Sequence, residues 1–270
     1  MANLDQYRVN ANKFSLKSIT PDDKSERTGD KAKDALMLQK LATEINALQD
    51  ILYAQGKYKI LLVLQGMDAS GKDGTVRHVF SECDPLGIRL ANFRGPTEEE
   101  LARDYLWRAH KAVPQKGEIA VFNRSHYEDV LIVKVHDWID EAECQRRYAQ
   151  INEFERMLTE TGTVIIKCFL HISKAEQKLR LQERLDDPTK TWKFNPNDLK
   201  ERDVWSKYMV AYENAINATS TSYAPWYVVP ADSKVNRNLI VSKLLLNALK
   251  TLKLSYPPVP AAFKTIKIAD

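Results

Sequence analysis

Cysteine is scarce in this chain, and long apolar runs are absent. The three cysteines, Cys83, Cys144 and Cys168, lie far apart in the sequence. Their spacing fits neither a zinc site nor a disulfide framework, so we expect reduced thiols. No window approaches the roughly 18 consecutive apolar residues of a membrane span, and the first residues carry no export signal. These absences exclude a membrane-spanning protein and predict a cytoplasmic one.

Neither sign of charge dominates the composition. The chain has 40 Lys and Arg residues against 36 Asp and Glu residues, which gives a formal net charge of +4. This balance permits a polyanionic partner if basic residues share a face, but it does not require one. We therefore predict no nucleic-acid partner and no membrane partner. At 270 residues the chain can bury the core of one α/β domain, or of one domain with an insertion, and we expect a single domain over residues 1–270.

Glycine is also sparse, yet three of the nine glycines fall within residues 66–74, which read G-M-D-A-S-G-K-D-G after an apolar run at 58–65. Glycine lets backbone N–H groups turn toward phosphate oxygens, and the following helix adds the positive end of its dipole. The segment predicts a phosphate-binding loop in which Lys72 reaches the outer phosphates. Asp73 stands where Ser or Thr normally holds magnesium in this motif. The predicted phosphate contacts in the loop are Ala69, Ser70, Gly71, Lys72, Asp73 and Gly74.

Short apolar runs alternate with helical patterns along the chain. The runs expected as strands lie at 60–64, 88–93, 119–122, 164–172 and 226–229. Apolar residues at spacings of three and four predict a helix over about 31–53. Alternating strands and helices predict an α/β fold, a P-loop kinase-like three-layer sandwich with a five-stranded parallel sheet and helices on both faces. We expect residues 1–29 to form an extended polar arm and the tail after Ser255 to be irregular.

Two helix starts carry a capping-box pattern. Thr97 precedes Glu100 by three positions, and Ser173 precedes Glu176 by three. In such a box the two side chains each bond the other residue's backbone N–H. The acidic run 98–100 is therefore interpreted as a first helical turn, not as a catalytic acid cluster.

The segment 184–207 interrupts the alternation of strands and helices. Pro188 and Pro196 prevent a continuous helix, and basic and aromatic residues alternate between them. One interpretation is a solvated connection whose lysines face water. The other is a mobile helical lid, which the phosphate loop favours because phosphoryl transfer benefits from exclusion of water. The lid would lay four basic side chains over bound phosphates: Arg184, Lys190, Lys193 and Arg202.

A second polar cluster follows the strand expected at 119–122. Asn123 ends this strand where a phosphate-loop enzyme usually keeps an Asp for magnesium. Mg²⁺ needs one or two carboxylates beside waters and substrate phosphates, so Asp68 with Glu128 would suffice, and Asn123 could orient a metal-bound water. Glu128 and the adjacent Asp129 could instead simply stabilise a helix start. His126 receives no role.

Four segments together resemble the second polyphosphate kinase family, whose members are polyphosphate:nucleotide phosphotransferases. The segments are G-M-D-A-S-G-K-D-G-T, P-T-E-E-E-L-A-R-D-Y-L-W-R, F-N-R-S-H-Y-E-D-V and R-L-D-D-P-T-K-T-W-K-F. The resemblance runs from about Tyr7 to Tyr256. It implies that Asp68 is a magnesium ligand and catalytic residue and that Lys72 binds phosphate. It also implies that Arg124 and Arg184 contact phosphates of the reacting pair.

The sequence departs from many members of that family at Asn123, where they carry Asp, and in the H-Y-E-D that follows Ser125. In this respect the chain is similar to the class III branch, which accepts nucleoside monophosphates and diphosphates and in which the residue matching Glu128 helps to hold the metal. The resemblance thus implies Mg²⁺-dependent, reversible transfer of the terminal phosphoryl group of polyphosphate to AMP or ADP. ADP and ATP are the products, guanine nucleotides are further candidate substrates, and a homodimer or homotetramer is expected.

Two other functions remain open from the residues alone. An ATP-dependent nucleotide kinase of the thymidylate-kinase type would share the loop, sheet and lid, although Asp73 and the Asn-ended strand count against it. A non-catalytic nucleotide- or polyphosphate-binding module would not need the carboxylate of Asp68 beside Lys72. The polyphosphate path is also open, with candidates Lys31, Lys33, Arg77, Arg89, Arg94, Arg103 and Arg108. So is the residue that stacks on the base, with candidates Phe93, Tyr105, Trp107 and Trp192.

Overall fold

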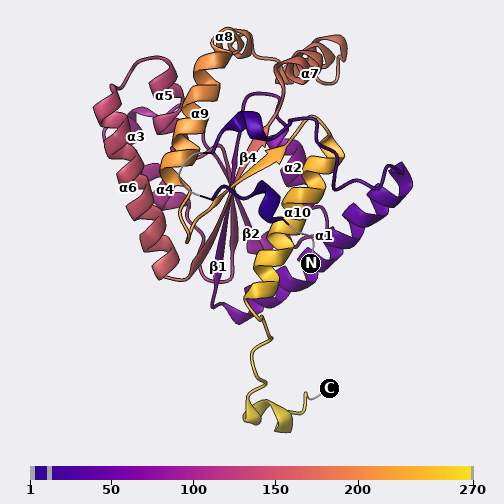
Figure 1. The fold of residues 1–270 in the computed structure, drawn as a ribbon. Coiled ribbons are helices and arrows are strands. Elements are labelled where there is room, and N and C mark those ends of the chain that lie inside the picture. Colours follow the sequence, from indigo (N-terminus) through magenta and orange to yellow (C-terminus); the bar gives the residue numbers. More distant parts are fainter. Residues whose placement is uncertain (1–3, 11–13, 269–270) are drawn as a thin grey trace.

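The computed structural model describes residues 4–10 and 14–268 and is built around one five-stranded parallel sheet (Figure 1). Its strands are β1 (Lys59–Gln65), β2 (Ile88–Asn92), β3 (Ile119–Asn123), β4 (Thr163–His171) and β5 (Trp226–Pro230). The strand order is β2-β3-β1-β4-β5, and every neighbouring pair is parallel. All five predicted strands are confirmed, because continuous apolar runs are typical of strands that are covered on both faces.

Helices cover both faces of the sheet, as predicted (Figure 1). One face carries α1 (Lys31–Gln55), α2 (Lys72–Val79) and α10 (Lys234–Thr251), which contact one another. The other face carries α3 (Glu98–Leu101), α4 (Trp107–Ala112), α5 (Ile132–Val135), α6 (Glu141–Glu160) and α9 (Trp205–Thr219). At the carboxyl ends of the strands lie α7 (Lys174–Asp186) and α8 (Asn197–Asp203). Six short 3₁₀ segments complete the described elements: η1 (Asp5–Tyr7), η2 (Leu16–Ser18), η3 (Pro85–Gly87), η4 (His126–Val130), η5 (Thr191–Lys193) and η6 (Ala261–Thr265).

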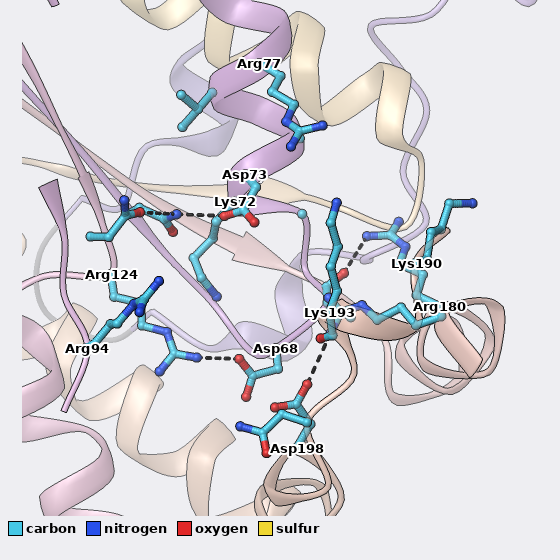
Figure 2. Close-up of a pocket in the computed structure, with 18 of the residues that line it drawn as sticks. Asp68, Lys72, Asp73, Arg77, Arg94, Arg124, Arg180, Lys190, Lys193 and Asp198 are labelled. Carbon is cyan, nitrogen blue, oxygen red and sulfur yellow. Dashed lines mark hydrogen bonds and ion pairs between the residues drawn. The ribbon is translucent and has the colours of Figure 1, made fainter. Parts of the chain in front are cut away.

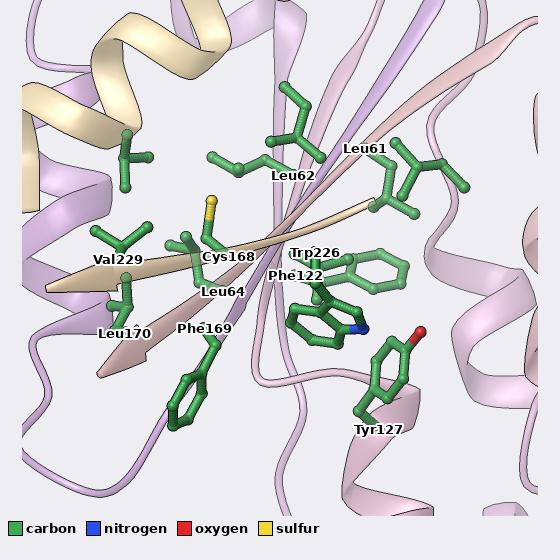
Figure 3. Packing of buried hydrophobic residues seen from close by; sticks show 14 of the residues in the cluster. Leu61, Leu62, Leu64, Phe122, Tyr127, Cys168, Phe169, Leu170, Trp226 and Val229 are labelled. Carbon is green, nitrogen blue, oxygen red and sulfur yellow. The ribbon is translucent and has the colours of Figure 1, made fainter. Parts of the chain in front are cut away.

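The central strand β1 is the most deeply enclosed part of the core. Residues Ile60 to Gln65 are all buried, because β3 and β4 flank the strand and helices cover both of its faces. Large aromatic side chains fill the side of the sheet toward α6 and α9, among them Phe122, Tyr127 and Trp226 (Figure 3). The aliphatic core and these rings fix the positions of the carboxyl ends of the strands, from which the loops of this edge begin.

The expected polar arm is only partly correct. Residues 1–3 and 11–13 of the arm lie outside the described residues, but Tyr7, Val9 and Leu16 are buried in the core. The Val9 backbone N–H donates to the carbonyl of Trp226 at 2.8 Å, so this segment lies along the edge of the sheet at β5. After α10 the chain leaves the body as an irregular tail with one 3₁₀ turn, η6 (Figure 1). None of the helices that the structure describes is long and apolar enough to cross a membrane.

The two predicted capping boxes have different outcomes. At Thr97 the box is complete, with the side chains of Thr97 and Glu100 each bonding the other residue's backbone. At Ser173 only half of it forms: the Ser173 hydroxyl accepts from the Glu176 N–H. The prediction of a second box was wrong because the Ser173 N–H donates to Asp232 and the Glu176 carboxylate pairs with Arg180 instead.

Candidate active site

The predicted phosphate-binding loop connects β1 to α2 at the centre of the sheet. Two glycines in it are required by close approach. A Cβ on Gly66 would lie 2.8 Å from the Leu170 carbonyl oxygen, and one on Gly71, where φ is +101°, would lie 1.9 Å from the Arg237 guanidinium. Ala69 also has a positive φ of +62°. These conformations turn the loop backbone around the N-terminus of α2, the arrangement that binds anions.

A cavity of about 960 Å³ opens beside this loop at the carboxyl edge of the sheet (Figure 2). It is bordered by the loop, by the ends of β2 and β3, and by the region of α7 and α8. Basic side chains reach it from several elements: Lys72, Arg77, Arg94, Arg124, Arg180, Arg184, Lys190, Lys193, Lys234 and Arg237. Such a concentration of positive charge at a helix N-terminus suits a polyanionic ligand.

Lys72 is buried against its own loop. Its Nζ donates to the carbonyl oxygens of Gly66 at 2.7 Å and Met67 at 3.2 Å. Burial, together with the nearby charge of Arg124, lowers the pKa of Lys72 to about 8. An anion bound in the cavity would favour the charged form, so the ammonium is suited to bind phosphate.

Arg124 lies between two carboxylates. Its Nη2 donates to Oδ1 of Asp68 at 2.5 Å (Figure 2), and its Nη1 is 4.0 Å from Oε2 of Glu128. The residue has a left-handed backbone, with φ of +60°, and its N–H donates to the Leu64 carbonyl at 3.0 Å. Burial raises the pKa of Glu128. The positive charges of Arg124 and Lys72 partly oppose this increase in pKa. Glu128 is not among the residues that line the cavity, and its side chain is only 15% exposed.

The donor set around Arg124 fits a divalent cation. The guanidinium stands where positive charge is needed to balance Asp68 and Glu128. Within residues 4–10 and 14–268 no trio of His, Cys, Asp and Glu side chains could hold a metal by itself. Mg²⁺ does not need such a trio, because it commonly keeps its waters and binds one or two carboxylates with substrate phosphates. The residues present are therefore compatible with magnesium.

Asn123 belongs to a different contact group. Its Nδ2 donates to Oδ1 of Asp73 at 2.7 Å and to Oδ1 of Asn92 at 2.9 Å. The amide thereby joins the ends of β2 and β3 to the start of α2. Both N–H groups of the amide are engaged by these acceptors, which leaves its carbonyl oxygen for any further contact.

The segment predicted as a lid contributes to the cavity, with one exception. Arg184 donates to Asp198 at 3.2 Å and to the Lys193 carbonyl at 3.3 Å, and Lys190 and Lys193 line the cavity. Burial and the charge of Asp68 raise the pKa of Asp198 to about 6. Arg202, which was predicted to cover phosphates, does not line the cavity in this structure. It donates instead to the Lys174 carbonyl and to Gln177, which joins α8 to α7.

Two buried arginines beside the loop were missed by sequence reasoning. Arg180 of α7 donates to the carbonyls of Ala69 and Ser70, and Arg237 of α10 also donates to that of Ser70. Burial and the proximity of Arg180 lower the pKa of Arg237 to about 9. These bonds turn the loop carbonyls toward α7 and α10, leaving backbone N–H groups for a ligand. No sequence signal marked either residue, because both occupy ordinary positions on helices distant in the chain.

The lining of the cavity reduces the number of candidate residues for the polyphosphate path and for stacking on the base. Of the seven basic candidates, only Arg77 and Arg94 line the cavity. Arg89, Arg103 and Arg108 pair with Glu118, Glu99 and Asp129, and Lys31 lies beside a second, smaller cavity. Of the four aromatic candidates, Phe93 and Trp192 line the cavity. Trp107 instead lies between Arg103 and Lys111, and Tyr105 contacts Arg147.

A phosphate-binding loop after the central strand, a cationic cavity and paired carboxylates define a phosphotransferase of the P-loop kinase type. The chain belongs to the Polyphosphate kinase 2 (PPK2) family, whose model matches residues 28–256. It is similar to the AMP/ADP-polyphosphate phosphotransferase of Meiothermus ruber, with 52% identity over 98% of this chain and 100% of that one. It is also similar to the ADP-polyphosphate phosphotransferase of Rhodopseudomonas palustris, with 44% identity over 82% of this chain and 81% of that one.

A solved structure supports the same family. The crystal structure of Polyphosphate Kinase 2 from Arthrobacter aurescens matches this fold with a TM-score of 0.92 and 47% identity, covering 96% of this chain and 94% of that one. The resemblance drawn from the sequence motifs is thus confirmed, and the chain is an enzyme, a polyphosphate kinase.

Proposed function

We propose that this enzyme transfers the terminal phosphoryl group of inorganic polyphosphate to AMP and to ADP, reversibly and with Mg²⁺. The observation that carries the proposal is the contact of Arg124 with Asp68 and Glu128, beside a buried Lys72 on a phosphate-binding loop. The name of the Meiothermus ruber relative, an AMP/ADP-polyphosphate phosphotransferase, agrees with both acceptors.

The reaction needs positioning and charge neutralisation more than covalent chemistry. An ionised phosphate oxygen of the acceptor must approach the anionic terminal phosphorus of the donor, so no general base is required. In the proposal, the loop N–H groups from Ala69 to Gly74 and the Lys72 ammonium hold phosphates at the transfer point. Arg124 and Arg184 stabilise the migrating group through planar, multi-donor contacts. Lys193 adds a phosphate contact from the opposite side of the cavity.

Asp68 and Glu128 are the proposed magnesium ligands, with Asn123 acting through a bound water. Magnesium supplies charge neutralisation at the phosphate oxygens. Asp68 pairs with Arg124 in the free protein; if Asp68 instead held magnesium, Arg124 would be available to phosphate.

The two ends of the cavity suit different substrates. Leu90, Asn92 and Phe93, from the β2 side, offer apolar surface and an amide, which suits a nucleoside. On the other side of the loop, α7 and α10 supply Arg180, Lys234 and Arg237. We assign the nucleoside to the β2 end and the polyphosphate chain to the α7 and α10 end, with Trp192 or Phe93 stacking on the base.

The proposal extends to the domain organisation of the chain, its location and its oligomeric state. Residues 1–270 are proposed to act as a single P-loop phosphotransferase domain whose lid module spans about 184–207. Support for the lid comes from the side chains of this segment that line the cavity, including Lys190 and Lys193. The enzyme is proposed to be cytoplasmic, to form a homodimer or homotetramer, and to accept guanine nucleotides as further substrates.

The test is to incubate purified protein with magnesium, long-chain polyphosphate and either AMP or ADP, and to resolve the nucleotides by chromatography. We expect ADP and ATP from AMP, with no ATP supplied. Formation of ATP from ADP but no product from AMP would reject AMP as an acceptor. A folded, metal-loaded sample that phosphorylates nucleotides only from ATP would refute polyphosphate as the donor.

A further inference from the structure

A buried polar cluster lies directly beneath the segment that carries Arg124 and Glu128. It consists of His126, Tyr127, Glu155, Lys167 and Thr219, which belong to η4, α6, β4 and α9. All five residues have 0% exposure. Tyr127 and Trp226 are in edge contact at this point in the core (Figure 3). Charged side chains are rare at such depth, so the cluster requires a physical explanation.

The contacts within the cluster are short and nearly complete. The Lys167 ammonium donates to Glu155 at 2.6 Å, to the Thr219 carbonyl at 2.7 Å and to the Tyr127 hydroxyl at 2.9 Å, which uses all three of its N–H groups. The Tyr127 hydroxyl in turn donates to Glu155 at 2.8 Å. The same carboxylate oxygen is 3.3 Å from Nε2 of His126. Glu155 therefore joins both residues of the loop segment to the sheet.

Stability alone does not explain an ion pair of this kind. The cost of removing two charges from water commonly matches or exceeds their attraction, and well-packed apolar side chains would stabilise the fold equally well. What the ion pair provides is directional bonding. The Tyr127 hydroxyl can satisfy both Lys167 and Glu155 in only a narrow range of ring positions.

The cluster residues His126 and Tyr127 lie between the site residues Arg124 and Glu128 in the chain. Arg124 precedes His126 by two positions, and Glu128 follows Tyr127 directly. At the start of this segment, the Ser125 hydroxyl accepts hydrogen bonds from the Tyr127 N–H at 3.1 Å and from the Gln65 side chain at 3.2 Å. The segment is thus bonded on its core side by the cluster and at its start by β1, while the guanidinium of Arg124 points into the cavity.

We propose that Tyr127, Glu155 and Lys167 are positioning residues for phosphoryl transfer. They fix the backbone of residues 124–128, and thereby hold Arg124 and Glu128 in the geometry that serves Asp68 and the reacting phosphates. The inference rests on the proposed roles of Arg124 and Glu128. It assigns a functional consequence to residues that touch neither substrate nor metal.

The test compares Tyr127→Phe with the double variant Glu155→Leu/Lys167→Met. The first removes only the shared hydroxyl, and the second removes both charges together, so that neither is left unpaired. Tyr223→Phe is the matched control, because its hydroxyl bonds the Asn152 carbonyl at 3.0 Å, away from the cavity. Each protein is examined for steady-state kinetics, for Mn²⁺ affinity by spin resonance, and for hydrogen exchange of the amides of residues 124–130.

We expect both cluster variants to remain folded and to lose about tenfold or more in kcat, in the range found for displaced positioning groups. The KM for nucleotide should change little, Mn²⁺ binding should weaken several-fold, and exchange at residues 124–130 should accelerate. The control should match the wild type in all three. A purely structural role would lower the unfolding temperature while leaving kcat per folded molecule, Mn²⁺ affinity and local exchange unchanged, and that result would overturn the proposal.

An Arg124→Ala variant measured in parallel separates this inference from the proposed function. If Arg124→Ala abolishes transfer and the cluster variants behave as the wild type, the positioning proposal alone fails. If Arg124→Ala transfers normally, the assigned site fails and the positioning role with it. Should the double variant not fold, Tyr127→Phe still decides, because it removes one atom and leaves the ion pair intact.

Discussion

Replacing Asp68 with asparagine should change metal-free binding and catalysis in opposite directions. In the free protein Asp68 pairs with Arg124 at 2.5 Å, and the two side chains keep 21% and 37% of their surface exposed. A phosphate chain that binds Arg124 must displace this carboxylate and also experiences its negative charge. Asparagine has nearly the same shape but lacks the charge, so Asp68→Asn releases the arginine without opening a void.

The size of the binding effect follows from the exposure of the pair. Partly exposed ion pairs contribute up to about 1 kcal/mol, well below the Coulomb energy of an isolated pair. Since about 1.4 kcal/mol corresponds to a tenfold change in affinity, polyphosphate should bind roughly two- to fivefold tighter to the variant when metal is chelated. With magnesium present, loss of a proposed ligand should reduce kcat by about 10²-fold or more, as for other lost electrostatic stabilisers.

The assay is titration calorimetry with polyphosphate in chelator, combined with turnover measured by nucleotide chromatography. Asp137→Asn is the control, because Asp137 pairs with Lys207 on the surface at 3.3 Å and does not line the cavity. The control should match the wild type in both measurements. Weaker metal-free binding by Asp68→Asn, or turnover close to that of the wild type, would refute the proposal that Asp68 exchanges Arg124 for magnesium.

Three further variants test separate parts of the site. Lys72→Ala should leave a folded protein with kcat reduced by about 10²-fold or more; near-normal turnover would remove Lys72 from the transfer point. Glu128→Asn should impair transfer to AMP more than transfer to ADP in parallel chromatographic assays. Equal losses would contradict the resemblance to the class III branch, which accepts both nucleoside monophosphates and diphosphates. Asp198→Asn should alter the pH dependence of stability, because the pKa of Asp198 is raised from 3.8 to about 6 in the folded protein. Between these two pH values the folded state retains a proton that the unfolded chain releases, so the wild type loses stability as pH rises through this window. Urea unfolding at pH 4.5 and pH 7 should therefore show the variant gaining relative to the wild type at the higher pH, and a constant difference contradicts the assignment.

The features that the sequence predicted well are local ones. The five apolar runs became the five strands because burial on both faces leaves no alternation to obscure them. The phosphate loop was identified because its three glycines and Lys72 fall within nine consecutive positions, 66–74. Their backbone requirements act within a few residues, so the motif carries its own geometry.

The features that escaped prediction depend on contacts between distant elements. Arg180 and Ser70 are 110 positions apart, and Arg237 and Ser70 are 167 apart, yet each pair is bonded at 3.1 Å. Arg202 does not line the cavity, and its guanidinium donates to Gln177 on a neighbouring helix. Nor could a sequence pattern reveal the burial of Lys167 with Glu155, since a Lys within a strand usually marks an exposed position.

In the free protein the cations of the phosphate site are bonded to oxygens of the same chain: Lys72 to the Gly66 carbonyl, Arg124 to Asp68, and Arg184 to Asp198. An incoming anion must therefore compete with internal partners at each position. A small anion such as chloride carries a single charge and can replace few of these partners at once. A polymeric phosphate replaces several in succession, and each replacement after the first is intramolecular. Internal pairing of this kind would favour anions that carry several phosphate groups over small anions.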